Sequence, residues 1–209
     1  MVVRPVPCGR THNGDALDST LQTLLAELAA YGDAHDADDG NRATRMLNIT
    51  PDTGEFLAVL AKATGARRIL ELGTSNGYST LWLAHAAGSD GTVATVEMSP
   101  EKIAMARANF EQAGLADRIT QHAGDAGQVL RAMDDGAFDL VFLDSQRSAY
   151  LDWWPDLRRV LRNGGLLVVD NATSHAHEML AFTEAVKADA GWTTCLVPVG
   201  KGEFVAVKA

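Results

Sequence analysis

Acidic residues stand where three successive predicted strands of the chain end, and their spacing suggests one kind of ligand. Glu71 precedes a turn that contains Gly73 and Gly77, Glu97 ends the second predicted strand, and Asp125 follows the third. Carboxylates at these places can accept hydrogen bonds from the hydroxyls of a ribose and from the amine of an adenine. Each acid alone could be a solvated residue at a strand end, but together they predict a site for an adenosine-containing cofactor.

The turn between Gly73 and Gly77 indicates which adenosine cofactor to expect. It lacks the G-x-G-x-x-G spacing that allows a pyrophosphate to approach the backbone. Glu71, just before the turn, would repel a pyrophosphate but suits a cationic amino acid group. S-adenosylmethionine carries both an ammonium and a sulfonium, so the charges favour this methyl donor over NAD.

A second set of polar side chains follows the next two apolar segments. Asp144 ends one of them, and Asp170 and Asn171 end the other. If the two segments are neighbouring parallel strands, these side chains converge at one edge of the sheet. Carboxylate and amide oxygens are the ligands of hard cations such as Mg²⁺. The pattern therefore predicts a divalent-cation site, although a single aspartate at a strand end is more often a cap or turn residue.

The elements that must position these residues alternate along the chain. Apolar runs predict strands, amphipathic stretches predict helices, and the last two strands flank a Pro- and Gly-containing turn. This order predicts an α/β fold of the Rossmann-like, doubly wound type: a mostly parallel seven-stranded sheet with a C-terminal antiparallel hairpin. The expected strands are 68–72, 92–96, 118–122, 138–143, 165–170, 192–197 and 203–207, and the expected helices are 18–31, one beginning at Thr50-Pro51, 77–87, 100–113, 126–133, 150–161 and 174–190.

Length and composition favour one domain of 209 residues, with 46% hydrophobic and 22% charged residues. We expect a loose arm over residues 1–17, a helix and loop over 18–45 and the cofactor-binding core over 46–209. A net charge of −9 argues against a nucleic-acid partner. No apolar segment is long enough for a signal peptide or a membrane span, and Cys8 and Cys195 match no metal or redox spacing, so we expect a cytoplasmic protein with no membrane partner.

The chain resembles the cation-dependent class I O-methyltransferases that use S-adenosylmethionine, the family of catechol and caffeoyl-CoA O-methyltransferases. The resemblance extends over about residues 45–208, and the order and spacing of its blocks agree. The matching blocks are 48–54, 70–79, 96–98, 124–125, 142–144 with Tyr150-Leu151, and 164–171.

This resemblance implies a role for each matching residue. Asp144, Asp170 and Asn171 would bind the metal ion, which would hold two vicinal oxygens of a small phenolic acceptor, and a homodimer would be expected. Glu71 and Gly73 would line the methionine end of the cofactor, Glu97 would bind the ribose and Met98 would pack on the adenine. The implied cofactor site comprises Ile49, Glu71, Gly73, Ser75, Gly77, Ser79, Glu97, Met98, Asp125, Ala126 and Asp144.

One position departs from the family pattern. Three residues after its first metal-binding aspartate the family usually has a lysine that is read as the general base, whereas this chain has Arg147. An arginine stays protonated and can stabilise a phenolate but cannot take its proton. His175 and His177 are alternative bases or members of a solvated helix face, and Arg147 could instead be a surface residue paired with Asp152.

The acceptor side allows several interpretations. Trp153 and Trp154 could wall an aromatic pocket or belong to the core, and Glu203 lies near the place of a further polar contact to the substrate in some relatives. The leading hypothesis is a metal-assisted O-methyltransferase in which Asp144 and Arg147 are catalytic. Its rivals are methylation of a hydroxylated tRNA base, a cofactor-binding protein without catalysis and an NAD-dependent oxidoreductase.

Overall fold

The computed structural model describes residues 17–41 and 44–209. The predicted loose arm therefore lies outside the described residues, apart from Leu17. In the described part of the chain, no helix is long and apolar enough to cross a membrane.

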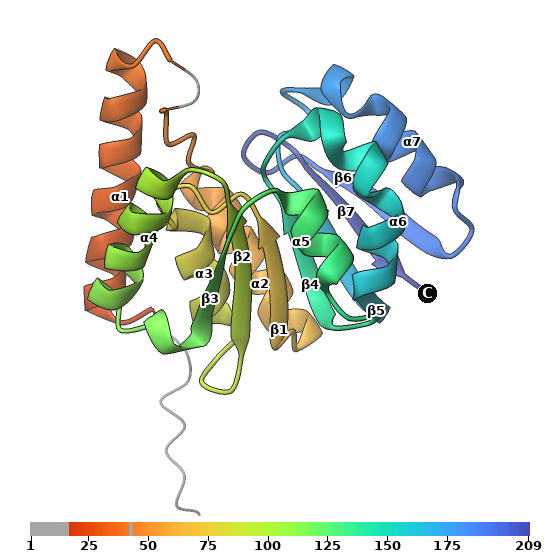
Figure 1. Cartoon of the computed structure of the whole chain (residues 1–209), viewed down its shortest axis with the longest axis horizontal. Helices are drawn as coiled ribbons and strands as arrows, with labels where there is room; N and C mark the ends of the chain where they lie inside the picture. Colours follow the sequence, from red (N-terminus) through yellow and green to blue (C-terminus); the bar gives the residue numbers. More distant parts are fainter. Residues whose placement is uncertain (1–16, 42–43) are drawn as a thin grey trace, which may run out of the picture.

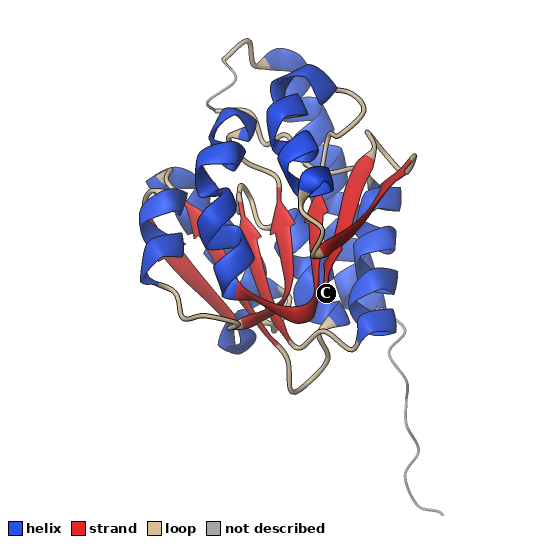
Figure 2. Ribbon diagram, turned by 90° about the vertical axis from the view of Figure 1, so that its right-hand side faces the viewer, coloured by secondary structure: helices blue, strands red, loops and turns tan. Residues whose placement is uncertain are grey.

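Seven strands form one sheet in the order β3-β2-β1-β4-β5-β7-β6, with helices on both faces (Figures 1 and 2). The strands from β1 to β5 pair in parallel, and β7 pairs antiparallel with both β5 and β6. This arrangement confirms the predicted fold class. The strands are β1 Arg68–Leu72, β2 Thr92–Glu97, β3 Ile119–Ala123, β4 Phe138–Leu143, β5 Leu161–Val169, β6 Trp192–Val197 and β7 Glu203–Lys208.

The helices begin where the sequence offers caps. Ser99 and Asp125 each accept a hydrogen bond from a backbone N–H in the first turn of the helix that follows, and Pro51 and Pro100 occupy first-turn positions where no N–H is needed. The helices are α1 Ser19–Asp38, α2 Pro51–Thr64, α3 Tyr78–Ala86, α4 Pro100–Gln112, α5 Ala126–Ala132, α6 Tyr150–Val160 and α7 Leu180–Ala188.

Two apolar clusters fill the space between the sheet and its helices. Side chains of α1, α2, α3 and α4 pack on one face, where Ile69 and Phe142 of the central strands point. The alternate residues Leu70, Val141 and Leu143 point to the other face, where α5, α6 and α7 cover them. Since β1 and β4 are buried on both faces, the carboxyl edge of the sheet is the part of these strands that remains open to a ligand.

Two predicted helices differ most in their bounds from the helices of the structure. The first helix was expected to end near Tyr31 but continues to Asp38, because Gly32 lies in the interior and packs against the Asn48 side chain instead of ending the helix. The last helix was expected from 174 but begins at Leu180. Residues 172–174 instead donate backbone hydrogen bonds to carbonyl groups of the β6–β7 turn, which holds them outside a helix.

Candidate active site

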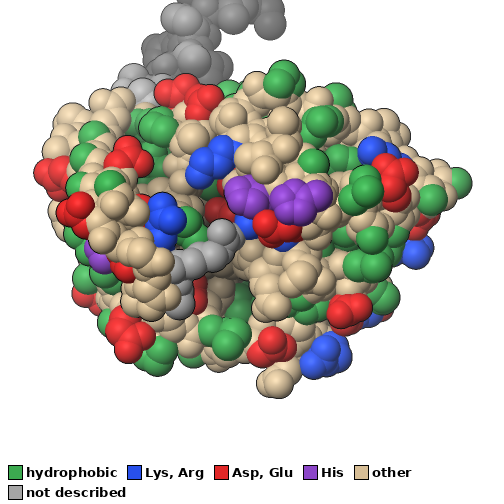
Figure 3. Space-filling model, turned by 90° about the horizontal axis from the view of Figure 1, so that it is seen from above, with side chains coloured by type: hydrophobic (Ala, Val, Ile, Leu, Met, Phe, Trp, Pro, Cys, Tyr) green, Lys and Arg blue, Asp and Glu red, His purple; other side chains and the backbone are tan. Residues whose placement is uncertain are grey.

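A cavity of about 1040 Å³ opens at the carboxyl edge of the sheet. Figure 3 looks onto this edge and shows a hollow near its middle, with basic and acidic side chains around it. The volume suits a ligand larger than a single amino acid. Its walls come from the 46–49 segment, the turn after β1, the first residues after β2, the 144–148 segment after β4, Asn171 after β5 and Lys201 of the β6–β7 turn.

The turn after β1 forms the floor of the cavity. Gly73 has φ +110°, and a side-chain carbon added there would lie 2.1 Å from the carbonyl oxygen of Asp144. The backbone N–H groups of Gly73 and Thr74 both donate to the carbonyl of Val96, at 3.1 and 3.2 Å. The turn is thus held between β2 and β4, and only glycine fits its closest approach.

Glu71 does not line the cavity. Its side chain is completely buried, and its carboxylate accepts hydrogen bonds from the hydroxyls of Ser79 at 2.5 Å, Thr95 at 2.6 Å and Thr80. Burial raises the pKa of Glu71 to about 7, although the three hydroxyls oppose this shift. The carboxylate therefore ties β1 and β2 to the start of α3, and its expected contact with a cofactor stays a prediction.

Glu97 lies in the cavity with both carboxylate oxygens oriented by backbone groups. One oxygen accepts from the N–H of Ser75 at 2.9 Å, and the other accepts from the N–H groups of Met98 and Ser99, each at 2.9 Å. These backbone donors fix the direction of the carboxylate. A rigid acceptor at the end of β2 is suited to a pair of ribose hydroxyls.

The 44–49 segment closes one side of the cavity. The Ser75 hydroxyl donates to the carbonyl of Met46 at 2.6 Å, and the Lys102 ammonium donates to the carbonyl of Arg45 at 2.7 Å. From α1, Asp36 accepts from the N–H groups of Met46 and Leu47. These bonds join α1, the turn after β1 and α4 to one wall, so the extension of α1 beyond residue 31 contributes to the site.

The side chains of Asp144, Asp170 and Asn171 meet at the same edge of the sheet. The Asn171 amide nitrogen donates to Asp170 at 2.6 Å and lies 3.4 Å from Asp144, while its oxygen accepts from the Ser174 hydroxyl at 3.1 Å. Asp144 and Asn171 line the cavity, and Asp170 lies just behind them with 3% of its surface exposed. The structure thus brings Asp144 together with Asp170 and Asn171, although Asp144 and Asn171 are 27 residues apart in the sequence.

This group has the chemistry of a divalent-cation site. Burial raises the pKa of Asp144 well above its usual range, and the charges of Asp170 and Glu71 raise it further. Rotating the Asn171 amide by half a turn would exchange its nitrogen and oxygen, so that its oxygen would take the place of the nitrogen beside the two carboxylates. Among the residues that the structure describes, no three His, Cys, Asp or Glu side chains are placed to hold a metal ion. The predicted set, with two carboxylates and one amide, fits a hard cation by donor type.

Glu203 extends the acidic group into the protein interior. It is completely buried, accepts from the Thr53 hydroxyl at 3.1 Å and is not among the residues that line the cavity. Burial, together with the charge of Asp170, raises the pKa of Glu203 to about 10. Glu203 is therefore neutral near pH 7, and its predicted contact with the acceptor stays a prediction.

Arg147 lies in the cavity wall and forms an ion pair. Only 7% of its surface is exposed, and its Nε donates to Glu178 at 2.8 Å. The interpretation of Arg147 as a surface residue paired with Asp152 is therefore wrong. The ion pair connects the segment that follows Asp144 to the segment that follows Asn171, so it braces the two sides of the acidic group.

The other predicted residues divide between the cavity and its surroundings. Ile49, Gly73, Ser75, Ser79, Met98 and His175 line the cavity. Gly77, Asp125, Ala126, Asp170 and His177 are not among the lining residues; Gly77 packs against Phe110, and Asp125 caps α5. The binding roles of these residues stay predictions.

The two tryptophans pack in the molecule instead of lining this cavity. Trp154 lies against Phe182 and Trp192 in the core, and Trp153 is partly buried beside Tyr150. Sequence reasoning missed Lys102 and Lys201 as cavity residues. Lys102 follows the Ser99 cap of α4 and could have been found from its closeness to Glu97. Lys201 lies in the turn between β6 and β7, and it reaches the cavity because β7 pairs antiparallel with β5 in the sheet.

A sequence model of the O-methyltransferase family matches residues 39–209. The chain belongs to the O-methyltransferase family. A catechol O-methyltransferase of Mycobacterium tuberculosis (strain ATCC 25618 / H37Rv) is 42% identical over 158 residues, which cover 74% of this chain and 69% of that protein.

Solved structures of O-methyltransferases agree with this assignment. An O-methyltransferase from Bacillus cereus, in complex with SAH, has a TM-score of 0.74 at 28% identity and covers 93% of this chain and 92% of its own. TomG from Streptomyces achromogenes, an O-methyltransferase involved in tomaymycin synthesis and solved with SAM, has a TM-score of 0.77 at 26% identity and covers 94% and 92%. The protein is an S-adenosylmethionine-dependent O-methyltransferase, as its sequence predicts. This excludes the oxidoreductase and the non-catalytic binding protein.

Proposed function

We propose that this O-methyltransferase methylates one hydroxyl of a small phenolic acceptor with vicinal hydroxyls, assisted by a divalent cation such as Mg²⁺. The observation that carries the proposal is the meeting of Asp144, Asp170 and Asn171 beside the cavity. The name of the Mycobacterium tuberculosis relative, catechol O-methyltransferase, supports the same acceptor class.

The residues at one end of the cavity would bind the cofactor, and those at the other end would bind the metal ion and the acceptor. S-adenosylmethionine supplies the methyl group from its sulfonium, with Glu97 holding the ribose and the turn after β1 fitting the methionine end. A divalent cation bound to Asp144, Asp170 and Asn171 would lower the pKa of an acceptor hydroxyl and hold two vicinal oxygens. Most of the rate acceleration would then come from positioning the acceptor oxygen against the methyl carbon.

Arg147 contributes its charge to this chemistry. Because a guanidinium stays protonated, it cannot accept the proton of the acceptor hydroxyl. Its ion pair with Glu178 keeps it in the wall near Asp144, where a positive charge stabilises negative charge that develops on the acceptor oxygen. His175 also lines the cavity and is the better placed of the two predicted histidine bases.

The proposal is tested by methyl transfer to catechol with added Mg²⁺ and with excess EDTA, using phenol as the matched acceptor that lacks the second hydroxyl. Methylated catechol that disappears with EDTA and returns with added Mg²⁺ is the expected result, with little transfer to phenol. Turnover that EDTA leaves unchanged would overturn the role of the metal ion. Salt-sensitive transfer to tRNA, with none to catechol, would overturn the small acceptor in favour of a nucleic acid.

A further inference from the structure

Charged side chains line both ends of the cavity. Glu97, at the end of β2, lies at one end, and Asn171 and Lys201 lie at the other, because β5 and β7 are on the opposite side of β1 and β4 from β2. Arg147 and Lys201 both line the end near Asn171. Asp144 and Glu178 line the same end, so acidic and basic side chains lie close together there.

The turn that carries Lys201 is held in place by its neighbours. The N–H of Thr173 donates to the carbonyl of Lys201 at 3.1 Å, and the N–H of Gly200 donates to Asp52 of α2 at 3.1 Å. Gly202 has φ +90°, and a side-chain carbon added there would lie 1.9 Å from the Thr173 hydroxyl. Since these contacts fix the backbone of Lys201 relative to the segment after Asn171, its side chain starts from a defined place on the rim.

Lys201 differs in its contacts from Arg147 and Lys102, the other basic side chains that line the cavity. Arg147 is paired with Glu178, and the Lys102 ammonium is bonded to the carbonyl of Arg45. In the described parts of the chain, the Lys201 ammonium has no hydrogen-bond or ion-pair partner, and it lines the cavity together with Asp144. Lys201 is thus a cation on the cavity rim that can pair with a ligand.

We propose that Lys201 binds a carboxylate carried by the acceptor, so that the preferred substrates are aromatic diols with an acidic substituent. This rests on the proposed function, because it assigns a group to the acceptor that is methylated there. Without a rim cation, Asp144 and Glu97 would repel an anionic acceptor. Lys201 offsets this repulsion and pairs with the carboxylate of the acceptor, which favours the acidic acceptor over a neutral one.

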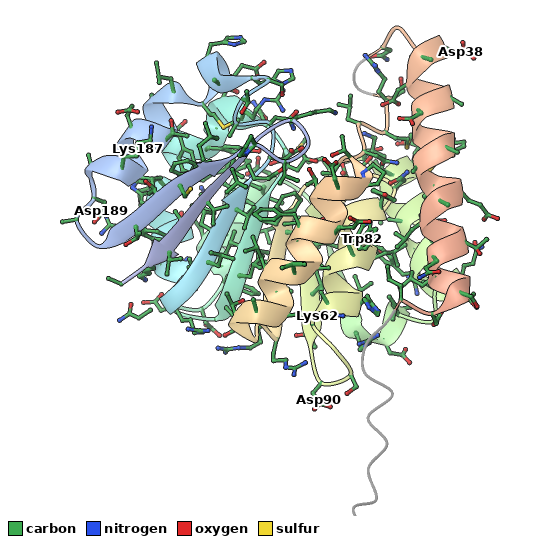
Figure 4. The ribbon with its side chains drawn as sticks, turned by 180° about the vertical axis from the view of Figure 1, so that it is seen from behind. Asp38, Lys62, Trp82, Asp90, Lys187 and Asp189 are labelled. Atoms are coloured by element: carbon green, nitrogen blue, oxygen red, sulfur yellow. The ribbon has the colours of Figure 1, made fainter. Side chains whose placement is uncertain are left out.

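The test compares two acceptors of nearly equal size, 3,4-dihydroxybenzoate and its neutral analogue 3,4-dihydroxybenzamide. The ratio of their kcat/KM values is measured for the wild type, Lys201→Met and Lys201→Arg. The ratio should fall by about fivefold in Lys201→Met, as expected for a partly exposed ion pair, and should be retained in Lys201→Arg. Lys187→Met is the matched control, since Lys187 lies on the outer side of α7 and pairs with Glu184 (Figure 4).

The outcomes separate this proposal from the proposed function. Both acceptors methylated with the same ratio in wild type and Lys201→Met would overturn the role of Lys201 and leave the proposed function standing. A weaker affinity for S-adenosylmethionine in Lys201→Met, with an unchanged ratio, would assign Lys201 to the cofactor and also overturn the proposal. If neither compound is methylated, the proposed function fails. Calorimetry then measures the binding of the two compounds to the protein with S-adenosylhomocysteine. Tighter binding of the benzoate, lost in Lys201→Met, would support the role of Lys201, and equal affinities for the two compounds would overturn it.

Discussion

Replacing Glu71 by glutamine should change how the stability of the protein depends on pH. Burial raises the pKa of Glu71 to about 7 in the folded protein, whereas the unfolded chain has the ordinary value of 4.5. The folded state therefore binds the proton more tightly than the unfolded state. The stabilisation from the protonated carboxyl is complete below pH 4.5 and is lost as the pH rises through 7.

The size of the effect follows from the pKa difference. One pKa unit corresponds to about 1.4 kcal/mol, so the wild type should lose about 3 kcal/mol of its free energy of unfolding between pH 4.5 and 8 through this group. Glutamine has nearly the same shape and no charge. The hydroxyls of Ser79, Thr80 and Thr95 can rotate to pair with its amide, so Glu71→Gln should remove the pH dependence without removing the contacts.

Urea unfolding followed by tryptophan fluorescence, from pH 4.5 to 8, measures this difference. The free energy of unfolding of Glu71→Gln minus that of the wild type should increase by about 3 kcal/mol over this range. Glu111→Gln is the matched control, because Glu111 is exposed on α4 and should leave the curve unchanged. Parallel curves for Glu71→Gln and the wild type would refute the reasoning that burial raises the pKa of the Glu71 carboxyl in the folded protein.

Three further substitutions test other parts of the site. Glu97→Ala should weaken binding of S-adenosylhomocysteine in calorimetry by at least about tenfold, because the ribose loses a charged acceptor; an unchanged affinity would contradict the ribose role. Gly73→Ala should lower the free energy of unfolding by at least about 2 kcal/mol, because its φ is +110° and the added carbon meets Asp144, whereas Gly40→Ala, with open space around it, should have little effect. Because the positive charge of Arg147 stabilises the acceptor oxygen, Arg147→Lys should keep most of kcat/KM on catechol and Arg147→Met should lose at least about tenfold. Equal losses in the two variants would argue against an electrostatic role.

Much of the fold could be predicted from the sequence because its signals are local. The buried runs of β4 and β5 read as strands by composition, and Pro51, Ser99 and Asp125 mark helix starts by their own chemistry. The end of α1 could not be predicted in this way. Gly32 reads as a helix end, but its fit against Asn48 depends on a segment 16 residues away in sequence.

In the candidate site, too, some residue positions could be predicted from local sequence and others could not. The strand-end positions of Glu97, Asp144 and Asn171 place them at the cavity, since parallel strands end at one edge. The direction of the Glu71 side chain could not be predicted, because it depends on hydroxyls that come from β2 and α3 as well as on β1. Lys201 reaches the site through the antiparallel pairing of β7, which has no motif in the sequence around the lysine.

The most direct test of the account is the substitution Asp170→Asn, assayed for both methyl transfer and cofactor binding. The change keeps the shape of the side chain and removes one negative charge from the group formed with Asp144 and Glu203, so the protein should remain folded. We expect Mg²⁺-dependent turnover of catechol to fall by at least about tenfold, because a cation loses a charged ligand, with the affinity for S-adenosylmethionine nearly unchanged. Full turnover in Asp170→Asn, with the same dependence on Mg²⁺ as the wild type, would contradict the assignment of Asp144, Asp170 and Asn171 as the metal site.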